Sequence, residues 1–90
     1  MKNKDLKIKA MNLKPTVQVG KSGFNDSIKE ELRSQFDSRE LIKIKVLRSA
    51  GPSAYWKDDL EKMVDELKAD LVEIKGNTAV VFKRSNKPKN

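Results

Sequence analysis

Residues 16–24 read TVQVGKSGF, and this stretch does most to set the fold of the chain. Val17 and Val19 alternate with polar neighbours, which is typical of a short strand with one buried face. Two glycines follow, and a polar pair, Asn25 and Asp26, can then cap a helix. A strand, a glycine-containing loop and a helix in direct succession predict a fold in which helices and strands alternate.

Hydrophobic periodicity continues the alternation toward the C-terminus. The predicted elements are a helix over residues 28–36, a strand over 41–47, a loop over 48–53, a helix over 56–67 and strands over 71–74 and 78–82. Ile28, Leu32 and Phe36 form the buried stripe of the first of these helices. The dipeptide Gly76-Asn77 predicts a hairpin between the last two strands.

The N-terminal residues predict one more helix. Leu6, Ala10 and Leu13 recur at helical spacing within residues 2–13, and Pro15 ends the pattern. The complete order is therefore α-β-α-β-α-β-β.

This order predicts an α/β fold of two layers, in which a four-stranded mixed sheet packs against helices. Right-handed crossovers place both inner helices on one face of the sheet and leave the other face open. Residues 79–82 are apolar on both faces, which suits a central strand. The length of 90 residues predicts a single domain over 1–84, followed by a basic tail over 85–90 without fixed structure.

Positive charge is concentrated at the two ends of the chain. The whole chain has 20 Lys and Arg residues against 13 Asp and Glu, which gives a net charge of +7. Residues 1–15 contain five lysines and one aspartate, residues 83–90 contain four basic residues and no acid, and the body between them is nearly neutral. The total charge therefore favours a polyanionic partner but gives only non-specific attraction.

The absent residue types exclude several kinds of chemistry. The chain has no Cys and no His, so disulfides, thiolate metal sites, Cys nucleophiles and His general bases are excluded. The longest apolar run is four residues, far below the roughly 20 that span a bilayer. We expect a soluble, cytoplasmic protein with no membrane association, no cofactor and no metal.

The sharpest local motif is Gly20, Lys21, Ser22 and Gly23, placed between a predicted strand and a helix N-terminus. Glycines let the backbone approach a ligand, and a helix start offers free N–H groups. Such a loop suits a nucleic-acid phosphate, as the GXXG loop of KH modules does. The alternative is a plain strand-to-helix turn. A phosphate-binding P-loop is excluded, because its first glycine would fall at Pro15.

Lys43 and Lys45 lie on the face of their strand opposite to the apolar one. On an open sheet face they would lie beside Gln18 and Lys75, with Glu73 weakening the positive patch. They predict a basic surface next to the loop. The alternative is that both lysines serve only solubility.

Two other classes of function compete with a nucleic-acid-binding role. Asp58 and Asp59 lie in a run of exposed helical carboxylates that could hold a metal in an enzyme, although a solvated helix face is the simpler interpretation. Trp56 falls on the apolar stripe and is expected in the core, whereas Tyr55 lies off it and could stack on bases. The open sheet face could instead dock another protein.

Four segments together resemble a known family. In order, they are Leu13-Lys14-Pro15, residues 17–24, residues 40–46 and residues 76–82. Their order and spacing resemble the CRM domain (chloroplast RNA splicing and ribosome maturation), especially its stand-alone YhbY-type form. The resemblance covers roughly residues 5–84. Lys83 follows the last strand where the family often has Arg.

The resemblance implies a fold like that of the C-terminal domain of translation initiation factor three, with strand order 1-2-4-3. It also implies a non-enzymatic, monomeric protein that binds ribosomal RNA in precursors of the large subunit and takes no small-molecule substrate. The residues expected to contact RNA are Gly20, Lys21, Ser22, Gly23, Lys43, Lys45, Lys14, Lys83 and Arg84.

Overall fold

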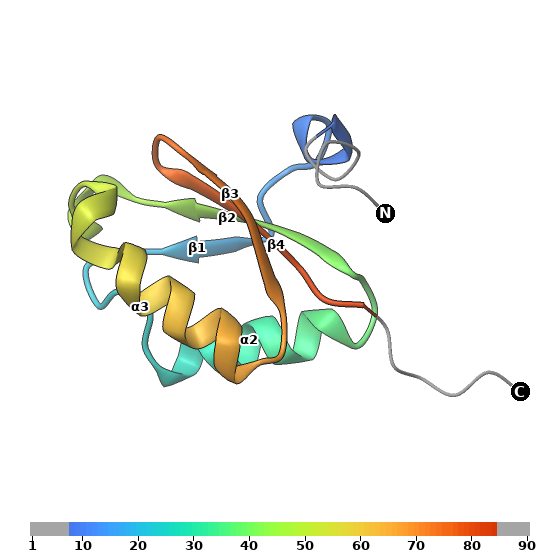
Figure 1. Cartoon of the computed structure of the whole chain (residues 1–90). Helices are drawn as coiled ribbons and strands as arrows, with labels where there is room; N and C mark the ends of the chain where they lie inside the picture. Colours follow the sequence, from blue (N-terminus) through green and yellow to red (C-terminus); the bar gives the residue numbers. More distant parts are fainter. Residues whose placement is uncertain (1–7, 85–90) are drawn as a thin grey trace, which may run out of the picture.

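A four-stranded sheet with two helices on one face makes up the computed structural model, which describes residues 8–84 (Figure 1). The elements are β1 (Val17–Val19), α2 (Asp26–Phe36), β2 (Leu41–Val46), the 3-10 helix η1 (Arg48–Ala50), α3 (Ser53–Glu66), β3 (Asp70–Lys75) and β4 (Thr78–Phe82). The predicted tail over 85–90 lies outside the described residues, as does Leu6. No helix among residues 8–84 has the length and apolar character needed to cross a membrane.

The sheet has the strand order β1-β2-β4-β3, as the resemblance implied. β1 pairs with β2 in parallel, and β4 pairs with both β2 and β3 in the antiparallel sense. β4 is therefore a central strand, and its residues Ala79, Val80 and Val81 are all buried. The predicted fold class and the position of this strand are confirmed.

The main core fills the space between the sheet and the two helices. It takes Val17, Val19, Ile42, Ile44, Val46, Ala79 and Val81 from the strands, Leu32 from α2, and Trp56, Leu60, Met63, Val64 and Leu67 from α3 and its end. Asn25 caps α2, since its side-chain oxygen accepts a hydrogen bond from the Ile28 N–H at 3.0 Å. The predicted apolar stripes of α2 and α3 and the alternation of β1 and β2 are confirmed.

The prediction that the opposite sheet face is open is wrong in part. Residues 8–11 are helical and lie on that face, where Ala10 is only 2% exposed and packs with Val72 and Val80. Leu41 and Phe82 pack against the same small cluster. These apolar side chains need a cover, and the N-terminal segment supplies it for part of the face.

The predicted N-terminal helix is shorter at its C-terminal end than its periodicity suggests. Helical backbone ends at Met11, and Leu13 is 36% exposed instead of buried. Lys43 on β2 lies under this end. Its ammonium group donates to the carbonyl oxygens of Ala10 at 3.2 Å and Leu13 at 3.4 Å. The Ala10 carbonyl also accepts from the Leu13 N–H at 3.1 Å, so Lys43 adds a charged donor to carbonyls at the C-terminal end of this turn.

Replacing Lys43 with methionine should loosen the N-terminal segment without unfolding the sheet. Hydrogen bonds to backbone carbonyls contribute about 1 kcal/mol net, so we expect the amides of residues 10–13 to exchange several times faster. Hydrogen–deuterium exchange measures this directly. Lys45→Met on the same strand face is the control and should leave these amides unchanged; equal exchange in both variants and the wild type would contradict the capping role.

Candidate nucleic-acid interface

The loop between β1 and α2 is a tight turn with a polar tip. The Gly23 N–H donates to the Gly20 carbonyl at 2.9 Å, and the Asn25 N–H donates to the Gly23 carbonyl at 3.0 Å. Lys21 and Ser22 occupy the two positions between the glycines, and both are exposed. The backbone is thus held by its own hydrogen bonds, and the two polar side chains point to solvent. We call these four residues the 20–23 loop.

The backbone conformation requires glycine at only one of the two glycine positions of the loop. Gly23 has φ +68°, in the left-handed region that L-amino acids avoid. Gly20 has no positive φ, and a Cβ on it would meet Leu47 Cδ1 at 3.7 Å and Ser49 Oγ at 3.5 Å, which are ordinary contacts. The turn therefore needs a glycine only at position 23, and the plain-turn interpretation does not account for Gly20.

Alanine substitutions should separate the two glycines. Gly23→Ala places a side chain in the left-handed region, so we expect it to lower the free energy of unfolding by about 1–2 kcal/mol. Gly20→Ala should be neutral or stabilising by up to about 1 kcal/mol, because the new methyl group has room and the unfolded chain loses freedom. Urea denaturation of both variants measures the difference. Equal losses would contradict this assignment.

A row of polar residues crosses the sheet at the same end as the 20–23 loop. Gln18, Lys45, Thr78 and Lys75 are aligned in register across β1, β2, β4 and β3. We call these four residues the polar row. β1 and β2 are parallel, so the chain leaves both strands at this end, and the loop and Lys45 are neighbours as the sequence predicted.

The segment after β2 contributes Arg48, which the sequence prediction missed, and is followed by Tyr55, which the sequence indicated as a possible base-stacking residue. The contacts of Gly20 place η1 directly beside the 20–23 loop, and its exposed Arg48 joins the same end of the molecule. Tyr55 is 76% exposed, and its ring lies so close to Gly51 that a Cβ there would be 2.9 Å from the ring. The parallel pairing of β1 and β2 was the available signal, because loops that follow neighbouring parallel strands lie together.

Four of the residues predicted to contact RNA do not lie at the end of the sheet next to the 20–23 loop. The ammonium group of Lys43 already binds two backbone carbonyls, and Lys14 follows the same N-terminal segment. The Lys83 N–H donates to the Glu40 carbonyl at 2.8 Å, which places Lys83 and Arg84 at the start of β2, the opposite end from the loop. The predicted contacts therefore fall into three groups. The 20–23 loop and Lys45 lie at one end of the sheet, Lys83 and Arg84 lie at the other, and Lys43 and Lys14 lie between them.

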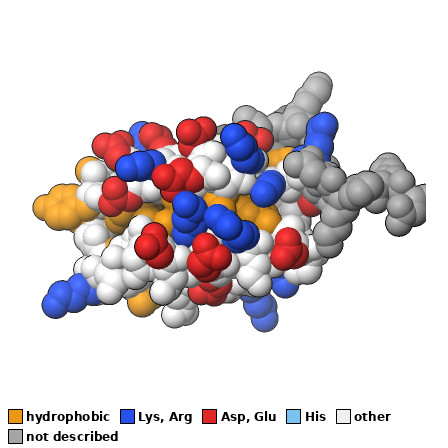
Figure 2. All heavy atoms as spheres, turned by 90° about the horizontal axis from the view of Figure 1, so that it is seen from below, with side chains coloured by type: hydrophobic (Ala, Val, Ile, Leu, Met, Phe, Trp, Pro, Cys, Tyr) orange, Lys and Arg blue, Asp and Glu red, His pale blue; other side chains and the backbone are white. Residues whose placement is uncertain are grey.

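The surface formed by α2 and α3, the helix face, has no extended patch of a single charge. Figure 2 shows acidic and basic side chains interspersed over this face, with apolar atoms between them. Lys29 of α2 pairs with Glu66 of α3 at 3.1 Å, and Arg33 lies 3.8 Å from Glu30. Within residues 8–84, no group of three acidic side chains is arranged to hold a metal ion. A polyanion would meet alternating attraction and repulsion here.

Comparison with known proteins gives a consistent family assignment. The model of the CRS1/YhbY (CRM) domain matches residues 1–83. The chain is 37% identical over 84 residues to the probable RNA-binding protein YqeI of Bacillus subtilis, covering 93% of this chain and 85% of that protein. It is 31% identical over 81 residues to the probable RNA-binding protein PA4753 of Pseudomonas aeruginosa, covering 86% and 72% respectively.

A solved structure shares the fold. The solution structure of the hypothetical protein SAV1595 from Staphylococcus aureus matches with a TM-score of 0.68 and 27% sequence identity. The match covers 97% of this chain and 88% of the other.

Proposed function

Because the chain belongs to the CRS1/YhbY (CRM) domain family, we propose that it binds RNA at the end formed by the 20–23 loop and the polar row. The observation that carries the proposal is that two exposed cations, Lys21 and Lys45, lie at the same end of the sheet, next to Gly20, which the turn itself does not require. The names of the relatives, which describe RNA-binding proteins, support it.

The chemistry of the loop suits a phosphate group. Gly20 leaves the backbone accessible, and Lys21 adds a full positive charge at the tip of the turn. The start of α2 adds a partial positive charge, although the exposed Asp26 in its first turn competes with a bound anion. Lys45 offers a second phosphate contact on the adjacent sheet. Attraction of this kind holds RNA by its backbone and positions it without reading its sequence.

The RNA that we propose is ribosomal RNA in precursors of the large subunit, bound without catalysis by a monomer in the cytoplasm. The resemblance to YhbY-type proteins suggests this target. Structured RNA also suits the site, because folded RNA is recognised through its phosphates and shape. The chain has only five Phe, Trp and Tyr residues in total, too few for a broad stacking platform for single strands.

Sedimentation of cell extracts tests the ribosomal target. The wild-type protein should co-sediment with particles lighter than the mature large subunit, and Lys21→Glu should shift it toward the free fraction. Crosslinking and sequencing of the RNA in that fraction should return large-subunit RNA. Protein that remains only in the free fraction, or crosslinks spread over messenger RNA, would contradict the ribosomal assignment.

Ribonuclease treatment separates RNA binding from the alternative of a protein-docking module. Digestion before sedimentation should release the protein if RNA holds it. Retention on ribosomal particles after digestion would favour docking on a ribosomal or initiation protein. The N-terminal segment covers part of the sheet face that such docking would use, and so leaves less of that face for a protein partner.

A further inference from the structure

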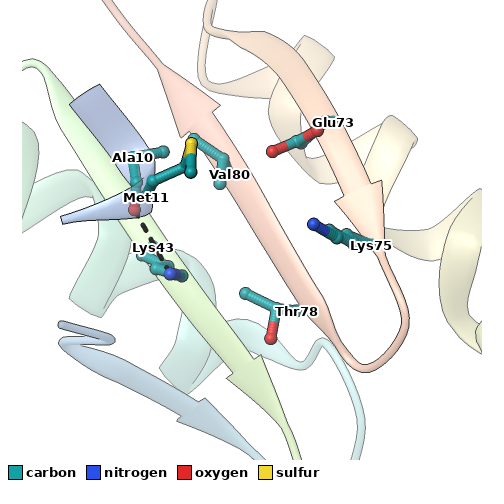
Figure 3. A pocket seen from close by; sticks show the side chains of 7 residues that line it. All are labelled: Ala10, Met11, Lys43, Glu73, Lys75, Thr78 and Val80. Atoms are coloured by element: carbon teal, nitrogen blue, oxygen red, sulfur yellow. Dashed lines mark hydrogen bonds between the residues drawn. The ribbon is translucent and has the colours of Figure 1, made fainter. Parts of the chain in front are cut away.

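A hollow of about 440 Å³ lies on the sheet face opposite α2 and α3 (Figure 3). It lies between the helical residues 8–11 and the hairpin of β3 and β4. Met11, which is 75% exposed, gives it most of its apolar surface, whereas Val80 also lines it but is only 2% exposed. Its volume lies within the range of roughly 300–1,000 Å³ typical of small-molecule sites. The space is large enough for one nucleotide base.

Polar groups surround this apolar surface. Figure 3 shows Lys75, Thr78 and Glu73 with their side chains directed toward the hollow, and Lys43 at its opposite side. Lys75 and Thr78 are also members of the polar row, which leads across the sheet through Lys45 to the edge beside the 20–23 loop. The hollow is therefore continuous with the proposed RNA interface.

Glu73 is the unusual member of this surface. The residue is half-buried, and its carboxylate makes no hydrogen bond or ion pair with any other residue in 8–84. A carboxylate repels phosphate, so a surface that only attracted the RNA backbone would gain nothing from it. A carboxylate beside an apolar floor instead suits a ligand that brings hydrogen-bond donors, as the exocyclic amino groups of nucleobases do.

We propose that this hollow receives one unpaired base of the bound RNA and that Glu73 favours bases with an amino group over uracil. The base would rest on Met11, and Glu73 would accept a hydrogen bond from the amino group of adenine, cytosine or guanine. Uracil has no amino group, and its N3–H donor lies between two carbonyl oxygens that repel a carboxylate, so its contact with Glu73 would be weaker. Lys75 and the Thr78 hydroxyl would hold the neighbouring phosphate and ribose. The inference rests on the proposed RNA binding and adds base selection to it.

Bulged hairpin RNAs provide the test. Four RNAs share one stem and loop and differ only in a single bulged nucleotide, A, C, G or U, and fluorescence anisotropy measures each Kd at one salt concentration. The wild-type protein should bind the U-bulge RNA roughly tenfold more weakly than the other three, as expected for one lost base contact. Glu73→Gln offers both a donor and an acceptor and should reduce this difference to less than about twofold.

Matched variants keep the result specific to the hollow. Glu61→Gln removes a charge from an exposed position on α3 and should keep the wild-type preference. Equal binding of the four RNAs by the wild type, with salt-dependent affinity retained, would overturn the base pocket but leave the proposed RNA binding intact. A preference that survives Glu73→Gln would also overturn it. Absence of salt-dependent binding to any of the four RNAs would overturn both proposals.

Discussion

Reversing the charge of both Lys21 and Lys45 to glutamate should weaken RNA binding about 20-fold or more at 0.15 M salt. Each phosphate contact makes the affinity fall with roughly the 0.7–0.9 power of the salt concentration. At 0.15 M salt, the loss of one such contact should therefore lower the affinity about fivefold. Two lost contacts give the 20-fold figure, and the new negative charges increase the loss. The slope of log K against log salt should become shallower by about 1.5. Filter binding over several salt concentrations measures both quantities.

The matched control reverses the same amount of charge on the helix face. Lys62→Glu with Lys68→Glu lowers the net charge of +7 equally, but it does so on α3 and just after its C-terminal end. This variant should lose only the small non-specific part of the affinity. An equal loss in both double variants, at similar thermal stability, would show that total charge and not the loop end determines binding.

Trp56→Ala should cost about 3–5 kcal/mol of the free energy of unfolding, as expected for a large aromatic residue deleted from a core. The Trp56 side chain is 2% exposed, and its ring centroid lies 5.8 Å from that of Phe24. The ring nitrogen also donates to the Gly51 carbonyl at 3.1 Å. Trp56 therefore joins the exit of the 20–23 loop to the turn that precedes α3. Urea denaturation at constant pH measures the loss.

Trp56→Phe separates the hydrogen bond from the packing. Phenylalanine retains most of the apolar contact but cannot donate to Gly51, so we expect a smaller loss of about 1–3 kcal/mol. A Trp56→Ala variant within 1 kcal/mol of the wild type would mean that the loop and the turn are held by other contacts.

The layers of the fold were predictable because the apolar residues of each element recur at the spacing of a helix or of a strand and so mark its buried face. The lysines of β2 alternate with Ile42 and Ile44, and this alternation alone gives the sheet face on which Lys43 and Lys45 lie. The position of Trp56 on a helical stripe gave its burial in the same way. The strand order came from the family resemblance, since periodicity does not determine which strands are neighbours.

The grouping of the candidate contacts was less predictable because it depends on tertiary neighbours. The hydrogen bonds from Lys43 to the carbonyls of Ala10 and Leu13 join residues about 30 positions apart, and no local sequence pattern predicts them. The position of Lys83 followed from the antiparallel pairing of β4, which turns its C-terminal end away from the 20–23 loop. The difference between the two glycines is a matter of backbone φ, which the motif alone does not contain.

Chemical-shift mapping tests the location of the RNA site most directly. A short hairpin RNA is titrated into ¹⁵N-labelled protein, and the amide shifts are followed along residues 8–84. The largest changes should occur in the 20–23 loop, at Lys45 and at Thr78, whereas the amides of Lys29 and Lys62 on the helix face should stay nearly constant. Changes centred on the helix face or on Lys83, with the amides of the 20–23 loop unmoved, would contradict the proposed interface.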